Sequence, residues 1–132
     1  MNLVVDTSVI VAILMSEPTR EKLIHLTRGV DLIAPSSVHW EVGNALAAML
    51  KRKRISIAQV RTVIAAYSAI PIRLVEVDLL EAMEIAAAHG IYAYDAYLIA
   101  CARENRCDLI SLDRGLLRAA RDAQVIVVEV IS

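Results

Sequence analysis

The feature that most constrains this chain is the alternation of short apolar runs with segments that have helical spacing and helix-capping residues. The runs are apolar throughout, which indicates strands that are buried on both faces. Strands that alternate with helices predict a parallel sheet covered by helices. The expected strands are residues 3–5, 32–35, 72–77, 109–112 and 125–130. We therefore expect an α/β fold, a three-layer α/β/α sandwich with a mainly parallel central sheet.

Capping residues mark the ends of the expected helices. Ser56 with Gln59, and Asp78 with Glu81, have the spacing of a capping box, in which each side chain binds a free backbone N–H of the other residue. Gly90 follows the last turn of the helix that Asp78 begins. The expected helices are residues 9–15, a segment between Pro18 and Gly29, a long helix from Ser36-Ser37 to about Arg54, the two segments that begin at Ser56 and Asp78, and residues 95–105 and 116–122.

Length and composition indicate one domain without a membrane span. The 132 residues, of which 58% are hydrophobic and 22% charged, are enough for one packed core over residues 1–132. The longest stretch without Asp, Glu, Lys or Arg has eleven residues, 62–72, whereas a spanning helix needs about 20. The N-terminus has no Lys or Arg before its short apolar run, so it does not fit a secretory signal. We therefore expect a cytoplasmic protein.

The net charge of −1 conceals a segregation of charge along the chain. Between Glu41 and Glu76 there are six basic residues and no acid, and from Glu76 to Asp95 there are five acids and no Lys or Arg. The six basic residues are Lys51, Arg52, Lys53, Arg54, Arg61 and Arg73. Such segregation can steer a charged partner. Alternatively, the run at 51–54 is a solvated helix end whose cations complement the helix dipole.

Four acidic residues occupy positions where an apolar core is expected. Asp6 and Asp113 each follow a strand directly, at the carboxyl end that borders the ligand crevice in open α/β sheets. Glu41 and Asp95 lie near helix starts and share a helix face with mostly apolar side chains, so both are expected to point toward the protein. The residues on those faces are Asn44, Ala45, Ala48 and Met49 for Glu41, and Leu98, Ile99 and Ala102 for Asp95. Each acid alone could be an ordinary N-cap or first-turn acid, but together they can converge on one crevice.

A cluster of four carboxylates needs compensation. Two carboxylates about 6 Å apart repel by roughly 3 kcal/mol at an effective dielectric near 20. Raised pKa values or a bound divalent cation would offset this repulsion. Carboxylate oxygens suit Mg2+ or Mn2+, whereas zinc sites draw on His and Cys; the histidines, His25, His39 and His89, are scattered and are expected to be structural. Mg2+ held by carboxylates commonly takes phosphate oxygens as further ligands, which points to phosphoryl chemistry.

Four segments carry a resemblance to a known family. They are Val5-Asp6-Thr7-Ser8-Val9-Ile10, Trp40-Glu41-Val42-Gly43-Asn44-Ala45-Leu46, Tyr94-Asp95-Ala96-Tyr97-Leu98-Ile99-Ala100 and Leu109-Ile110-Ser111-Leu112-Asp113-Arg114. In this order and spacing, and over essentially the whole chain, they resemble the PIN-domain ribonucleases and, within those, the VapC toxins of toxin–antitoxin pairs. The resemblance places the family's acidic quartet on Asp6, Glu41, Asp95 and Asp113. It also places recurrent polar residues on Ser8, Asn44 and Ser111: Ser111 to bind a metal-bound water or a phosphate oxygen, Ser8 and Asn44 to support the acids.

The resemblance implies an endoribonuclease. One or two Mg2+ or Mn2+ ions held by the quartet, with Asp6 as the central ligand, would activate a water that attacks an RNA phosphodiester in line and leaves a 5′-phosphate and a 3′-hydroxyl. It also implies a homodimer and a small VapB-type antitoxin. Candidate contacts to RNA phosphates are Lys51, Arg52, Lys53, Arg54, Arg114, Arg118 and Arg121. Aromatic residues are few, which favours a structured RNA recognised by shape; Tyr92, Tyr94 and Tyr97 could stack on bases or serve packing.

Two other interpretations stay open. An aspartyl-phosphate phosphohydrolase of the haloacid-dehalogenase type also has an Asp after its first strand, but its D-x-D motif needs an acid where Ser8 stands. A noncatalytic RNA- or protein-binding module could keep the same fold. Such a module would have no reason to retain the four acids or to bind Mn2+.

Overall fold

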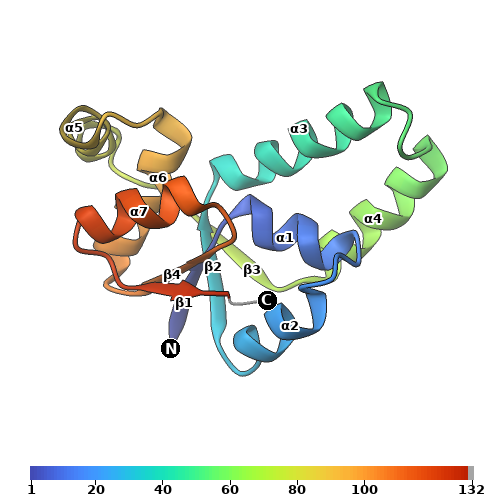
Figure 1. Cartoon of the computed structure of the whole chain (residues 1–132), viewed down its shortest axis with the longest axis horizontal. Coiled ribbons are helices and arrows are strands. Elements are labelled where there is room, and N and C mark those ends of the chain that lie inside the picture. Colours follow the sequence, from blue (N-terminus) through green and yellow to red (C-terminus); the bar gives the residue numbers. More distant parts are fainter. Residues whose placement is uncertain (131–132) are drawn as a thin grey trace.

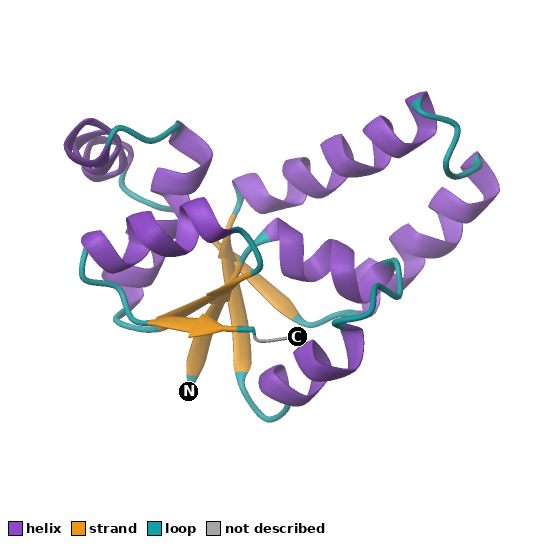
Figure 2. Ribbon diagram, in the orientation of Figure 1, coloured by secondary structure: helices purple, strands orange, loops and turns teal. Residues whose placement is uncertain are grey.

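The computed structural model describes residues 1–130, in which five strands form one sheet with every neighbouring pair parallel (Figures 1 and 2). The strand order is β3-β2-β1-β4-β5. The strands are β1 (Asn2–Val5), β2 (Asp31–Pro35), β3 (Ile72–Val75), β4 (Asp108–Ser111) and β5 (Val127–Glu129). All five strands lie within or close to the apolar runs from which they were predicted.

Seven helices within residues 1–130 connect the strands and cover both faces of the sheet. They are α1 (Thr7–Leu14), α2 (Arg20–Thr27), α3 (Ser37–Lys51), α4 (Ile57–Ala69), α5 (Leu79–His89), α6 (Ala93–Asn105) and α7 (Arg114–Asp122). Figure 1 shows α1 to α4 on one side of the sheet and α5 to α7 on the other. Right-handed crossovers explain this division, because the chain moves in one direction from β1 to β3 and in the opposite direction from β3 to β5. The predicted three-layer sandwich is confirmed.

The three inner strands form the centre of the core. Val4, Ile33 and Ile110, from β1, β2 and β4, are fully buried. The edge strands β3 and β5 are only partly buried, and Arg73 and Leu74 of β3 are exposed. The expectation that all strands are buried on both faces is therefore wrong for the edges, where a strand has a neighbour on one side only.

Side-chain caps set several of the helix starts. The capping box of Ser56 and Gln59 is present, with both hydrogen bonds formed. Asp78 caps α5 through the backbone N–H of Leu80. Its own N–H, however, donates to the carboxylate of Glu104 on α6. The capping box expected between Asp78 and Glu81 is wrong, because a carboxylate from another helix accepts this N–H.

Asp6 and Asp113 stand where the topology of the sheet changes direction. The neighbouring strands β1 and β4, with Val5 opposite Ile110, lead into helices on opposite faces, α1 and α7. Diverging connections of this kind open a crevice at the carboxyl ends of the two strands.

No helix within residues 1–130 is both long enough and apolar enough to span a bilayer.

Candidate active site

Asp6, directly after β1, is a buried carboxylate whose two oxygens are both hydrogen-bonded. Only 4% of the residue is exposed. Its Oδ1 accepts from Ser8 Oγ at 2.7 Å and from the Val9 N–H at 3.3 Å, the latter as the cap of α1. Its Oδ2 accepts from Ser111 Oγ at 2.6 Å. Asp6 is therefore held in one orientation by its own loop and by the end of β4.

Ser8 and Ser111 tie the ends of β1 and β4 together. Ser8 Oγ accepts the backbone N–H of Leu112 at 3.0 Å, and Ser111 Oγ accepts that of Asp113 at 2.9 Å. Ser111 is fully buried. Its hydroxyl is thus occupied by Asp6 and the backbone, and it has no surface open to a phosphate or to a metal-bound water. The structure places Ser111, like Ser8, as a residue that orients Asp6.

Asp113 is exposed and begins α7. Its Oδ1 accepts the backbone N–H groups of Gly115 at 2.9 Å and Leu116 at 3.2 Å. A carboxylate here is favoured by the positive end of the helix dipole. Gly115 leaves the room for it, since a Cβ at that position would lie 3.3 Å from Asp113 Oδ1.

Asp95 is half-buried in the first turn of α6. The helix begins at Ala93 after Tyr92, so Asp95 is not an N-cap. Its helix face carries the buried side chains Leu98 and Ile99. The carboxylate therefore extends from the edge of the core, as the sequence predicts.

Glu41 is half-buried on α3, but not on the face that the sequence suggests. The buried side of α3 runs through Val38, Val42 and Leu46, whereas Asn44, in the face predicted to point inward, is exposed. Glu41 stands at the border of the buried side. Even so, its Oε2 is a buried atom without a hydrogen-bond partner in residues 1–130. Within residues 1–130 Asn44 makes no hydrogen bond to any of the four acids, so no observed contact supports the predicted role of Asn44.

The four acids share one electrostatic environment. Burial raises the pKa of Asp6 despite its three hydrogen bonds, and Asp113 raises it further. Burial also raises the pKa of Glu41 to about 7, with added repulsion from Asp6 and Asp95. For Asp95, burial and then Asp113 raise the pKa. No Lys, Arg or His within the described residues forms an ion pair with any of them, so the repulsion is uncompensated by the chain itself.

The donor set fits a hard cation bound partly through water. All candidate ligands are carboxylate oxygens, which Mg2+ and Mn2+ prefer. Residues 1–130 contain no three His, Cys, Asp or Glu side chains already arranged as a metal site. Mg2+ usually keeps several waters and is held by one or two carboxylates together with substrate phosphates, so the chemistry of the four acids suits this ion better than zinc, which draws on His and Cys.

Basic candidates lie at two different distances from the acids. Arg114 and Arg118 are exposed on α7, directly after Asp113, and with Arg121 they line a hollow of about 450 Å³. The run Lys51, Arg52, Lys53 and Arg54 is exposed at the far end of α3, where Figure 1 shows the turn into α4. Ten residues along a helix correspond to about 15 Å, so this run is well separated from Glu41. Among these candidates Arg114 follows Asp113 directly, and Arg118 lies about one helical turn further along α7.

Two hydroxyl groups near the acids did not emerge from the sequence. Ser37 Oγ and Thr7 Oγ1 are buried atoms without a hydrogen-bond partner in the described part of the chain. Ser37 is four residues before Glu41, a spacing that places both on one side of α3. That spacing was the available signal for Ser37; its burial was not readable from the sequence.

The chain belongs to the PIN domain family, whose model matches residues 3–122. Solved structures of similar fold include PAE2754 from Pyrobaculum aerophilum, with a TM-score of 0.74, 22% identity, and coverage of 96% of this chain and 83% of that chain. A chain of VapBC2 from Rickettsia felis, bound to a DNA fragment from its promoter, has a TM-score of 0.68 and 12% identity. The match covers 97% of this chain and 98% of that chain. VapC20 of Mycobacterium tuberculosis, described as a sarcin–ricin loop cleaving toxin, has a TM-score of 0.63 and 16% identity. The match covers 89% of this chain and 94% of that chain. No curated protein matches the sequence.

Proposed function

We propose that this PIN-domain protein is a Mg2+- or Mn2+-dependent endoribonuclease and the toxin of a VapBC-type pair. The observation that carries the proposal is the group of four mutually repelling acids, two after β1 and β4 and two on α3 and α6. None of them has a cationic side-chain partner in residues 1–130. Similar folds in VapBC2 and in VapC20, a toxin described as cleaving the sarcin–ricin loop, support the choice of reaction.

Asp6, Glu41, Asp95 and Asp113 would hold the cation. When bound there, a divalent cation lowers the pKa of a water and neutralises charge on a phosphodiester. Asp6 contributes an oriented oxygen pair, because Ser8 and Ser111 prevent its rotation. Glu41 contributes an oxygen, Oε2, that has no other partner in the described residues. The raised pKa of Glu41 indicates that added positive charge is favourable at this side chain.

Basic side chains would bind the phosphates of RNA on either side of the acids. Arg114 follows Asp113 directly and Arg118 lies about one helical turn further along α7, so they would contact phosphates closer to the cleaved bond than the run at 51–54. The run at 51–54 would reach phosphates further along a structured RNA. Contacts of this kind give an affinity that falls as salt rises.

Exposed apolar side chains support the two proposed protein partners. Leu79 and Leu80 at the start of α5 are 61% and 67% exposed, Met83 one turn later is 38% exposed, and Tyr92 beyond the end of α5 is 89% exposed. Apolar groups this exposed are a feature of protein interfaces. We infer a homodimer and a VapB-type antitoxin that blocks the acidic site, both in the cytoplasm.

Replacement of Asp6 tests the proposal directly. In Asp6→Asn we expect cleavage of RNA to fall by at least about 100-fold, since an oriented charge at the reacting centre is lost. EDTA should abolish wild-type cleavage, and added Mg2+ or Mn2+ should restore it. Asp31→Asn is the matched control, because Asp31 is exposed at the opposite end of β2. Thermal melts verify that both variants fold, and cleavage that survives either Asp6→Asn or EDTA contradicts the proposal.

The two alternatives make different predictions. A noncatalytic module would not bind Mn2+ in a calorimetric titration, whereas we expect binding that weakens in Asp6→Asn. An aspartyl-phosphate enzyme of the haloacid-dehalogenase type needs an acid two residues after its nucleophile. Ser8 stands at that position and donates to Asp6, which argues against that chemistry.

A further inference from the structure

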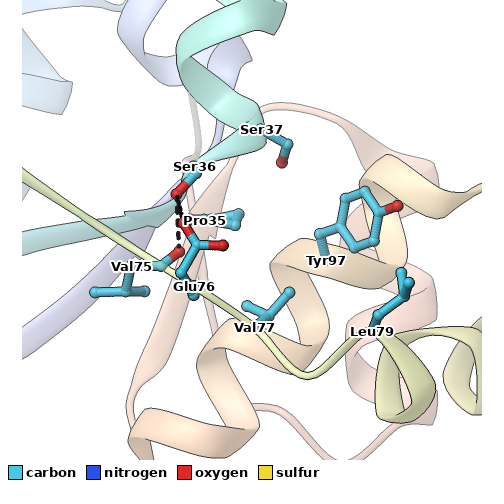
Figure 3. Close-up of a pocket in the computed structure, with 8 residues that line it drawn as sticks. All are labelled: Pro35, Ser36, Ser37, Val75, Glu76, Val77, Leu79 and Tyr97. Atoms are coloured by element: carbon cyan, nitrogen blue, oxygen red, sulfur yellow. Dashed lines mark hydrogen bonds between the residues drawn. The ribbon is translucent and has the colours of Figure 1, made fainter.

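A second hollow, of about 240 Å³, lies at the carboxyl ends of β2 and β3 (Figure 3). In the β1–β2 register Val4 pairs with Ile33, and Asp6 and Pro35 each stand two residues after this pair, so both lie at the same edge of the sheet. Pro35 in turn pairs with Val75. The hollow is lined by Pro35, Ser36, Ser37, Val75, Glu76, Val77, Leu79 and Tyr97.

Two helices, α3 and α6, each supply one of the four acids and one residue of the lining of this hollow. Ser37 precedes Glu41 by one helical turn on the same side of α3, whereas Tyr97 follows Asp95 by two residues and faces a different side of α6. An RNA that reaches Glu41 would therefore lie about one helical turn from the Ser37 side of this hollow. At about 240 Å³ it is smaller than pockets for drug-sized ligands, which run from about 300 to 1,000 Å³, so it suits a single flat group.

The Glu76 carboxylate and the Ser37 hydroxyl are the polar groups that decide which ligand chemistry this hollow accepts. Glu76 Oε1 accepts from Ser36 Oγ at 2.7 Å, which fixes the carboxylate, while Oε2 accepts no hydrogen bond from residues 1–130. Figure 3 shows the Glu76 carboxylate and the Tyr97 ring on opposite walls. Ser37 Oγ, also on the lining, is buried and unpartnered in the described residues.

The negative charge of Glu76 excludes a phosphate, and the polar groups disfavour a purely apolar occupant. The remaining lining is apolar, with one aromatic ring, which suits the faces of a nucleobase. A fixed carboxylate prefers a base edge with adjacent N–H donors. Guanine offers N1–H and the N2 amino group side by side, whereas uracil offers a single N–H and adenine and cytosine offer an amino group alone.

We propose that this hollow binds an unpaired guanine of the RNA next to the cleaved bond, with the Glu76 carboxylate accepting from its Watson–Crick edge and Tyr97 packing on the base. The assignment deepens the proposed ribonuclease function and rests on it. It makes Glu76 a specificity-determining residue, not a catalytic one, and it predicts that base preference and cleavage chemistry can be separated.

The test compares cleavage of a randomised RNA pool by the wild type and by Glu76→Gln, with Mg2+ or Mn2+ present. We expect the wild type to prefer guanine at one position beside the cut by about 10- to 100-fold, the range of one good bidentate contact to a base. Glu76→Gln should lose that preference while still cleaving the pool. Glu84→Gln, an exposed glutamate on α5 with the same change of charge, should keep it.

The outcomes separate this inference from the proposed function. If the wild type cleaves no RNA, the ribonuclease function fails. If the wild type cleaves but shows no guanine preference, or if Glu76→Gln retains that preference, only the guanine site is overturned. A change of oligomeric state in Glu76→Gln, with base preference intact, would instead assign the hollow to a protein interface.

An NMR titration tests the assignment independently of cleavage. In the wild type, GMP but not UMP should shift the backbone signals of Ser36, Ser37 and Tyr97, and in Glu76→Gln neither nucleotide should do so. Equal shifts with both nucleotides would overturn the assignment.

Discussion

The strand-borne half of the site differs from the helix-borne half in how its acids are held. Asp6 and Asp113 follow β1 and β4, and their oxygens accept hydrogen bonds from serine hydroxyls and backbone N–H groups. Glu41 and Asp95 on α3 and α6 accept none from residues 1–130, and Glu41 Oε2 is buried without a partner. Both halves are acidic, but only one has its geometry set by the chain.

This difference indicates a division of labour. Hydrogen-bonded carboxylates at the strand ends are preorganised, so a ligand that binds them meets a fixed geometry. The helix-borne carboxylates are subject mainly to burial and repulsion, which a cation would relieve. We therefore expect changes to the strand-borne half to cost stability as well as activity, and changes to the helix-borne half to cost activity alone.

The largest effect is expected for Glu41→Gln. Cleavage of RNA should fall by at least about 100-fold, because a charge at the reacting centre is lost. The metal-free fold should not be destabilised, since Gln keeps the shape of the side chain and removes a repelling charge. Cleavage rates and urea unfolding of Glu41→Gln, with exposed Glu17→Gln as control, measure both quantities. A less stable fold with unchanged cleavage would refute the division between the two halves.

Ser111→Ala should have a smaller effect on activity but a clear effect on the fold. The change leaves Asp6 Oδ2 and the Asp113 N–H without their partner. Loss of such an orienting contact typically lowers metal affinity by about 10- to 100-fold, and unsatisfied buried groups cost about 1–3 kcal/mol. Calorimetry with Mn2+ and urea unfolding test this, with exposed Ser68→Ala on α4 as the control. Unchanged Mn2+ affinity would show that Asp6 does not depend on this serine.

The smallest effect is expected in the pH dependence of the metal-free protein. The pKa of Glu41 is raised from an ordinary 4.5 to about 7, so the folded state binds this proton more tightly than the unfolded state. The resulting stability is complete below about pH 4.5 and is lost as pH rises through about 7. Because Glu41 is half-exposed, the loss is on the order of 1–2 kcal/mol. The raised pKa values of Asp6 and Asp95 act in the same direction.

Urea unfolding in EDTA between pH 5 and pH 8 measures this loss. The free energy of unfolding should fall less steeply with pH in Glu41→Gln than in the wild type. Mg2+ should restore the stability of the wild type at pH 8. Stability that stays level or increases with pH in the wild type would show that the repulsion among the acids is already compensated.

Much of the fold follows from short-range chemistry. Apolar runs long enough for one strand, separated by capped helical segments, predict all five strands and seven helices within a few residues. The errors lie at the ends of elements, one made by the local backbone and one by a partner on another helix. For example, the long helix ends at Lys51 and not near Arg54, with Lys53 in the left-handed region at φ 59°. Asp78 likewise donates its N–H to Glu104 of another helix.

The four acids could be selected from the sequence because each stands at a recognisable position, after a strand or near a helix start. Their partners could not. The burial of Ser111, the exposure of Asn44 and the position of Glu41 at the border of the buried side depend on how α3 and β4 pack. The hollow beside Glu76 is likewise formed by residues from β2, β3, α3, α5 and α6 together with the β3–α5 connection.

The sequence by itself determined the order of strands and helices and the residue types available for chemistry, because backbone periodicity and capping act over a few residues. Only the tertiary structure decided which side chains meet. The bond from Ser111 Oγ to Asp6 Oδ2 joins residues 105 positions apart, and it exists because β1 and β4 pair in one register. A shift of that register by one residue would move Ser111 to the other face of the sheet.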